Sequence, residues 1–203
     1  MPIPVVVPFL LVGAALARRK PLTGRRGEGR VRSSREDLAA AGVTDELLDQ
    51  LDARGRRLLD SVGVRYVFGG GAPDSTWPTG STSPLAPEDL EDEEGWDCAG
   101  HHQACAVQLG ILPRSAPDRG SAALSKLGQA VEVGRQRLGD GAFFGTPVSH
   151  VMTVLTDADA AGHSWVIGAS GGTSKTFGQN PKARIKVFRT QDYRGDFRFF
   201  RRM

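Results

Sequence analysis

The sequence predicts a single α+β domain in which helices come first and an antiparallel sheet follows. Segments with helical periodicity begin after residue 35 and again after residue 97, and short alternating segments typical of strands fill the last third of the chain. At 203 residues the chain is long enough for one domain with its own core. A hydrophobic content of 39% and a charged content of 24% exclude a wholly disordered chain and a polytopic membrane protein.

An apolar arm and a basic linker are expected over residues 1–35, ahead of the folded domain. Residues 2–17 are apolar and are followed, not preceded, by positive charge, which does not match a secretory signal. The run is also short for a bilayer span. We expect this arm to contact other subunits of a larger assembly, or alternatively a membrane surface. No nucleic-acid partner is expected, because the basic linker lacks interleaved aromatic residues and the net charge is only +3.

The folded domain is expected over residues 36–203 and begins with two helices. The first ends at Gly42, and the second starts at the capping residue Thr44 and carries leucines at helical spacing as far as Leu59. A strand with a glycine turn is predicted over residues 62–71. The Pro-, Ser- and acid-rich residues 72–95 are predicted to form an insertion loop at the rim of a site.

The remaining elements follow from the positions of glycine and from the hydrophobic pattern. They are a helix from Cys98 to about Gly110, a short helix over 121–126, a connecting segment over 129–137, and strands near 138–145, 149–155, 164–170 and 184–188. The strands at 149–155 and 164–170 are expected to form a hairpin around the turn at 156–162.

Cys98 stands at the predicted start of a helix. Unpaired backbone N–H groups and the helix dipole at such a position favour the thiolate over the thiol, which is how a nucleophile is prepared. Cys105 lies two turns further on, about 10 Å along the helix axis, so the two cysteines are predicted to be free thiols. The alternative is a zinc site formed by Cys98, Cys105 and His101 or His102. No second Cys/His pair supplies a fourth ligand, so neither a metal nor another cofactor is expected.

A cysteine peptidase needs an imidazole to hold the thiol proton and donors that face the oxyanion. His150 opens a predicted strand well after Cys98. The two side chains can meet only if the helix packs on the sheet.

Five ordered sequence blocks resemble those of the NlpC-like cell-wall cysteine peptidases. These blocks are residues 63–70, 96–100, 110–114, 138–144 and 149–151. The resemblance covers about residues 55–172. It implies a reduced papain-like fold, with the nucleophile helix packed on an antiparallel sheet, and hydrolysis of amide bonds in peptidoglycan stem peptides.

The resemblance also implies roles for individual residues. Cys98 would be the nucleophile, its backbone N–H would form part of the oxyanion hole, and His150 would be the general base. Tyr66 would lie beside the thiolate as a substrate or oxyanion contact, and Asp97 would line the substrate end.

This chain departs from the family pattern at three places. Folding the hairpin about its turn places Gly168 where the family has a polar residue that orients the histidine, which leaves Ser170 and His163 as candidates for that role. Ala99 stands where the family commonly has Ser, and polar His101 and His102 replace an apolar pair.

The C-terminal residues 187–202 loosely resemble the endings of family members carried by phage tails. The sequence therefore predicts a peptidoglycan endopeptidase in a virion or tail-like particle that acts at the bacterial cell wall, with a membrane-associated protein as the alternative location. Two alternative functions remain open, a catalytically degenerate structural module of such an assembly and an N-acetylmuramoyl-L-alanine amidase.

Overall fold

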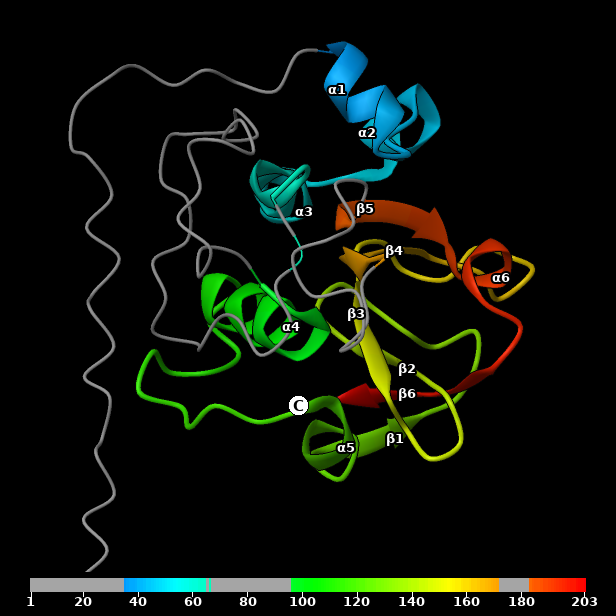
Figure 1. Ribbon diagram of the computed structural model, residues 1–203. Coiled ribbons are helices and arrows are strands. Elements are labelled where there is room, and N and C mark those ends of the chain that lie inside the picture. The colour runs from blue at the N-terminus through cyan, green and yellow to red at the C-terminus, as the bar shows by residue number, and fades with distance from the viewer. Residues whose placement is uncertain (1–34, 65, 67–95, 172–182) are drawn as a thin grey trace, which may run out of the picture.

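The computed structural model describes residues 35–64, 66, 96–171 and 183–203. The helices are α1 (Arg35–Ala40), α2 (Asp45–Gln50), α3 (Ala53–Leu58), α4 (Cys98–Gln108), α5 (Ser121–Leu124) and α6 (Thr190–Tyr193). The strands are β1 (Gln129–Val131), β2 (Gly141–Phe144), β3 (His150–Val154), β4 (Trp165–Ser170), β5 (Arg184–Arg189) and β6 (Phe197–Arg202). Within these ranges, helices α1 to α5 precede the strands, as the sequence predicts, and the short helix α6 lies between β5 and β6 (Figure 1).

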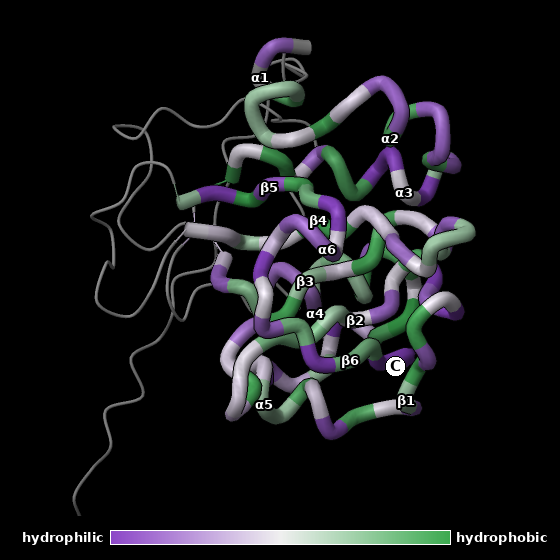
Figure 2. Tube along the Cα trace, turned by 90° about the vertical axis from the view of Figure 1, so that its right-hand side faces the viewer, coloured by the Kyte–Doolittle hydropathy of each residue, from purple (hydrophilic) through white to green (hydrophobic). Residues whose placement is uncertain are grey.

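The strands form one antiparallel sheet in the order β1-β6-β2-β3-β4-β5. Figure 2 shows them one below another in this order, from β5 at the top to β1 at the bottom. Helix α4 packs against β3 and β4, and α1 to α3 lie at the β5 edge (Figure 1). The prediction of an α+β fold with the Cys98 helix packed on an antiparallel sheet is confirmed.

The segment that the sequence predicts as one helix from Thr44 to Leu59 is two helices. Leu51 adopts an extended conformation, and Asp52 then caps the second helix by accepting a hydrogen bond from the Gly55 N–H at 2.7 Å. A 3₁₀ turn over Leu59–Ser61 continues α3. The leucine periodicity hid this break, because an aspartate N-cap restarts a helix without disturbing the apolar face.

Residues from the predicted 62–71 strand run beside β5. The Gly63 N–H donates to Ile185 at 3.0 Å, and the Tyr66 N–H donates to Ala183 at 2.9 Å. Tyr66 also forms an isolated parallel bridge with Trp96, the residue two before α4. These hydrogen bonds place Tyr66 close to the start of the Cys98 helix.

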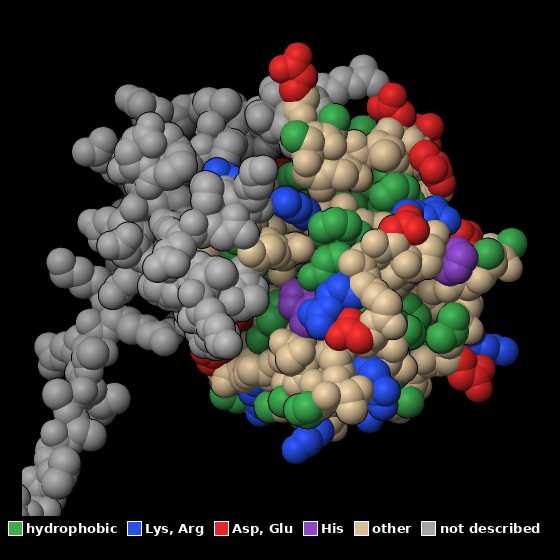
Figure 3. All heavy atoms as spheres, turned by 45° about the vertical axis from the view of Figure 1, so that its right-hand side comes forward, with side chains coloured by type: hydrophobic (Ala, Val, Ile, Leu, Met, Phe, Trp, Pro, Cys, Tyr) green, Lys and Arg blue, Asp and Glu red, His purple; other side chains and the backbone are tan. Residues whose placement is uncertain are grey.

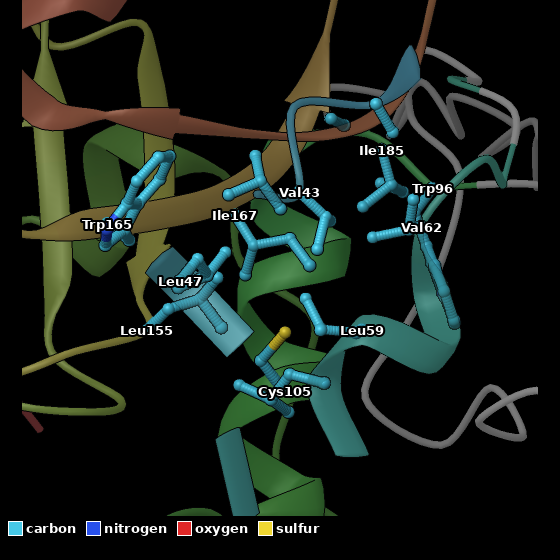
Figure 4. Close-up of a cluster of buried hydrophobic side chains, with 14 of the residues drawn as sticks. Val43, Leu47, Leu59, Val62, Trp96, Cys105, Leu155, Trp165, Ile167 and Ile185 are labelled. Carbon is cyan, nitrogen blue, oxygen red and sulfur yellow. The ribbon is translucent and has the colours of Figure 1, made fainter. Parts of the chain in front are cut away.

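Apolar side chains are buried on both faces of the sheet. The larger cluster joins α1 to α3, α4, β4 and β5, and Figure 4 shows Leu47, Leu59, Cys105 and Ile167 meeting within it. Each such fully buried aliphatic side chain contributes about 1.5–3 kcal/mol. A second cluster around Phe144 and Met152 lies on the other face, with Tyr193 of α6 packed against it. A third cluster packs Cys98 and Ala99 with Val151 and neighbouring residues at the start of α4.

The C-terminal residues complete the sheet, which the sequence pattern did not predict. Strand β6 lies between β1 and β2, and residues 129–131, expected to be a connecting segment, form edge strand β1. Gly128 has a φ of +64°, and a Cβ there would lie 2.0 Å from the Arg202 carbonyl oxygen, so only glycine fits. Arg202 donates to both carboxylate oxygens of buried Asp140, at 2.9 and 2.8 Å, and so fastens the end of β6.

Charge is unevenly distributed over the surface. Figure 3 shows acidic side chains gathered at the top of the molecule, over α1 and α2, whereas Lys and Arg side chains are spread over the rest of this face. Among the described residues, no helix is long and apolar enough to cross a membrane. Apart from Arg35, the predicted arm over residues 1–35 lies outside the described residues, as does the predicted loop over 72–95.

Candidate active site

Helix α4 begins at Cys98 because Asp97 caps it. The Asp97 backbone is extended, and its carboxylate accepts a hydrogen bond from the Gly100 N–H at 2.7 Å. This is the N-cap geometry that Asp favours, and it leaves the thiol of Cys98 in the first turn. Cys98 is 8% exposed and is not in a disulfide, as predicted.

The thiol of Cys98 has a pKa raised to about 11. Burial is the largest cause, and the negative charge of Asp97 adds to it. The backbone N–H groups of Val151, Ala99 and Cys98 itself lower the pKa. The expected effect of the helix start is therefore present, but burial and Asp97 outweigh it. The Cys98 side chain is therefore a neutral thiol at neutral pH.

His150 is the first residue of β3 and is 8% exposed. Its Nε2 atom lies 2.9 Å from the hydroxyl oxygen of Tyr193, and its ring lies against the rings of Tyr193 and Phe144, with centroids 5.5 and 5.9 Å away. Burial, with a smaller contribution from Arg194, lowers the pKa of His150 to about 4. The imidazole is therefore neutral at neutral pH and able to accept a proton.

Cys98 and His150 approach the same end of the sheet from different elements. One of the backbone N–H groups that act on the Cys98 sulfur belongs to Val151, the residue directly after His150. Val151 also packs with Cys98 in the third apolar cluster. Tyr193, which contacts the His150 ring, also lies near Cys98. A negative charge on the Cys98 sulfur would raise the pKa of Tyr193. Val151 and Tyr193 therefore both lie near Cys98 and next to His150, one along the chain and the other in space.

Tyr66 lies beside the same thiol, as the family resemblance implies. Its side chain is buried, and its pKa is raised above the usual value by burial first and then by the charges of Cys98, Asp97 and Tyr193. The chain contains two tyrosines, and both lie at this site. Asp97 acts as the helix cap and as a negative charge beside the sulfur.

The hairpin register differs from the one inferred from its turn. Thr153 pairs with Ile167, and Val154 pairs with Val166. Continuing this register places Gly168 opposite Met152, not opposite His150. A Cβ on Gly168 would indeed lie 3.0 Å from the Met152 side chain. The prediction for Gly168 is therefore wrong. It assumed a symmetric turn over residues 156–162, whereas the turn extends two residues further on the β4 side.

Ser170, not Gly168, occupies the register position across from His150. Its side chain lies close enough to the Tyr193 hydroxyl to lower the tyrosine pKa, and Tyr193 itself contacts His150. His163, the other predicted candidate, lies in the turn at the opposite end of the hairpin, where its N–H donates to Asp159 at 2.9 Å. The structure brings Ser170 to the site and does not bring His163 there.

Tyr193 is a partner of His150 that no sequence pattern predicted. It lies at the end of a four-residue helix after β5, where neither periodicity nor a motif marks it. Its position depends on how the chain returns to the sheet after β5. A single tyrosine just ahead of the C-terminal aromatic segment was the only available signal.

His101 and His102 are fully buried and face separate partners. His101 Nε2 lies 2.9 Å from the Ser61 hydroxyl and 3.6 Å from the Cys105 sulfur, and His102 Nδ1 lies 2.8 Å from the Thr153 hydroxyl. Burial lowers the pKa of these two histidines to about 3 and about 4 respectively. Among the described residues, no group of three His, Cys, Asp or Glu side chains is arranged to hold a metal ion.

Taken together, the site has a thiol at a helix start, a neutral histidine at a strand start and backbone N–H groups beside the sulfur, which are the groups that nucleophilic catalysis by a thiol requires. In comparisons with known proteins, no family model and no curated protein matches the chain. It is similar to two solved P60 domains of M. avium subspecies paratuberculosis. The domain of antigen MAP1204 shares 21% identity, over 77% of this chain and 94% of that chain, with a TM-score of 0.47. The domain of antigen MAP1272c shares 19% identity, over 78% and 96%, with a TM-score of 0.49.

Proposed function

We propose that this protein is a cysteine peptidase of the NlpC-like, papain-like type that hydrolyses amide bonds in peptidoglycan stem peptides. The observation that carries the proposal is the contact between the Cys98 sulfur and the backbone N–H of Val151, the residue after His150. In addition, His150 Nε2 is hydrogen-bonded to the Tyr193 hydroxyl. With Nε2 occupied, Nδ1 is the ring nitrogen left to take the thiol proton. The five sequence blocks that resemble this family supply the substrate class.

The raised thiol pKa and the lowered imidazole pKa define how the nucleophile is activated. At neutral pH the pair rests as thiol and imidazole, not as thiolate and imidazolium. His150 therefore acts as a general base that removes the thiol proton as the sulfur attacks the substrate carbonyl carbon. The carbonyl π bond opens and places negative charge on the oxygen, where the N–H groups of Cys98 and Ala99 can stabilise it.

The remaining steps return the protein to its resting state. The imidazolium of His150 gives its proton to the leaving amine as the C–N bond breaks, which leaves a thioester on Cys98. A water molecule, deprotonated by His150, then attacks the thioester carbon, and the C–S bond breaks as the carboxylic acid is released. The thiolate recovers its proton from the imidazolium. Tyr66, which lies beside the sulfur, is placed to contact the bound substrate.

The choice of bond is a separate part of the proposal. Ala99 cannot provide the hydroxyl that a serine would offer to the free amine of a stem peptide. The same attack can also open the link between the sugar lactyl group and the first stem residue, which is the reaction of an N-acetylmuramoyl-L-alanine amidase. We favour cleavage within the stem, because the sequence blocks resemble those of endopeptidases.

Digestion of purified peptidoglycan with the full-length protein tests both parts. We expect new amino termini inside the stem, and release of whole stems instead would identify an amidase. Cys98→Ala and His150→Ala should each abolish release. Cys105→Ala is the matched control, because Cys105 is a buried thiol in the same helix that faces the core. No release by wild type, or equal release by Cys98→Ala, would leave a catalytically degenerate structural module.

We further propose that the apolar arm attaches this enzyme to a phage tail or tail-like particle, with membrane association as the alternative. The apolar composition of residues 2–17 supports an attachment role. Deleting residues 1–34 should preserve peptidoglycan cleavage and abolish association with particles or membranes. Unchanged association would refute the proposal.

A further inference from the structure

We propose that Tyr193 is the positioning residue for His150, and that Ser170 acts behind it to fix which ring nitrogen carries the proton. The inference rests on the proposed function, in which His150 is the general base. The orienting role thus falls to a tyrosine from α6, which lies outside the β3–β4 hairpin that carries the predicted candidates.

The hydroxyl of Tyr193 makes a hydrogen bond of normal length with His150 Nε2, at 2.9 Å. The ring of Tyr193 also restricts the imidazole, because the two rings lie 5.5 Å apart at an interplanar angle of 33°. The Phe144 ring contacts the Tyr193 ring edge to face, with the ring centroids 5.2 Å apart, and the centroid of the Phe188 ring lies 4.7 Å from that of Tyr193. Aromatic contacts therefore hold the ring while the hydroxyl holds Nε2.

Helix α6 is itself fastened to the sheet, so that Tyr193 has a defined position. The Thr190 hydroxyl donates to the Ser164 carbonyl at 2.6 Å and accepts from the Ser164 N–H at 3.0 Å. The Thr190 N–H donates to the same carbonyl at 2.9 Å. After the helix, Arg194 pairs with Asp196 at 2.8 Å, and the Asp196 carbonyl accepts from the Gly145 N–H at 3.0 Å. Both ends of the short helix are thus held.

The direction of the hydrogen bond is inferred from the other polar groups near the Tyr193 hydroxyl. Ser170 and Arg194 lie close enough to this hydroxyl to lower the tyrosine pKa. Arginine can only donate, whereas the serine oxygen can accept the phenol proton. In the proposed arrangement the serine oxygen takes the phenol proton, and the phenol oxygen accepts the N–H of His150 Nε2. This arrangement leaves Nδ1 without a proton, which is the tautomer that a general base requires.

The tautomer can be measured without substrate, by ¹⁵N NMR of histidine-labelled protein at pH 7, where His150 is neutral. In wild type we expect one form, with the proton on Nε2. Tyr193→Phe keeps the ring and removes the hydroxyl, so the His150 signals should shift toward a mixture of both tautomers. Ser170→Ala should shift them in the same direction, because the phenol proton then turns toward Nε2. Phe188→Leu is the matched control, since it alters packing against Tyr193 but no polar group, and it should leave the tautomer unchanged.

Activity provides the second measurement. Loss of one hydrogen bond that orients the base should lower kcat about tenfold in Tyr193→Phe, with KM little changed. Wild-type His150 protonated on Nδ1, or a single Nε2-protonated form retained in both Tyr193→Phe and Ser170→Ala, would overturn the inference. Because the NMR result needs no turnover, a protein that fails to cleave peptidoglycan but shows the expected tautomer shifts would refute the proposed function alone.

Discussion

Acid should destabilise this protein through its buried histidines. His101, His102 and His150 are at most 8% exposed, and burial lowers their pKa values to about 3, 4 and 4. In the unfolded chain a histidine titrates near pH 6.5. Between pH 6.5 and about 4, the unfolded state therefore binds protons that the folded state excludes, so the free energy of unfolding falls as the pH falls.

The size of the effect follows from the pKa differences. With a folded-state pKa of 4 and an unfolded value of 6.5, one histidine loses about 2 kcal/mol of stabilisation between pH 7.5 and pH 5. The three together lose about 6 kcal/mol, which is comparable to the whole stability of many domains. We therefore expect the protein to approach its acid unfolding midpoint near pH 5.

Urea unfolding at a series of pH values between 7.5 and 5 measures this loss directly. In His102→Gln the pH dependence should decrease by about one third, since one of three groups no longer titrates. Ile185→Val, a substitution in the core, is the matched control and should lower stability by about 1 kcal/mol equally at every pH. A change of less than about 1.4 kcal/mol between pH 7.5 and pH 5 in wild type would show that these rings titrate normally in the folded state.

Three further predictions concern the Cys98 thiol and the C-terminal strand. Alkylation of Cys98 by iodoacetamide should accelerate continuously from pH 6 to pH 9, because its pKa is raised to about 11, whereas a rate independent of pH would indicate a preformed ion pair. Asp97→Asn keeps a helix cap and removes the negative charge, so alkylation at pH 8 should accelerate about three- to tenfold, and an unchanged or slower rate would contradict the role of Asp97. Gly128→Ala should destabilise the protein by about 2 kcal/mol or more, because its Cβ would collide with the Arg202 carbonyl, and thermal unfolding measures the loss. Gly120→Ala is the control, since a Cβ there meets no atom within 4 Å, and an equal loss in both variants would disprove the collision.

Local sequence signals were sufficient to predict the elements that carry Cys98 and His150. Helix α4 starts at Cys98 because Asp97 is a capping residue, and β3 starts at His150 where alternation begins. Such features depend on residues adjacent in the chain. The break at Leu51 and the strand at Gln129–Val131 were missed, because a restarted helix keeps its apolar face and an edge strand needs little hydrophobicity.

The sequence by itself identified Cys98 as a candidate nucleophile and His150 as a candidate base, and it determined the order in which their helix and strand occur. Only the tertiary structure decided the environment of those residues. Burial raises the thiol pKa and lowers the imidazole pKa, and the hairpin register brings Ser170, not Gly168, across from His150. The contact between Tyr193 and His150 joins residues 43 positions apart. Solvent exclusion and strand register depend on contacts between distant segments, which no local pattern encodes.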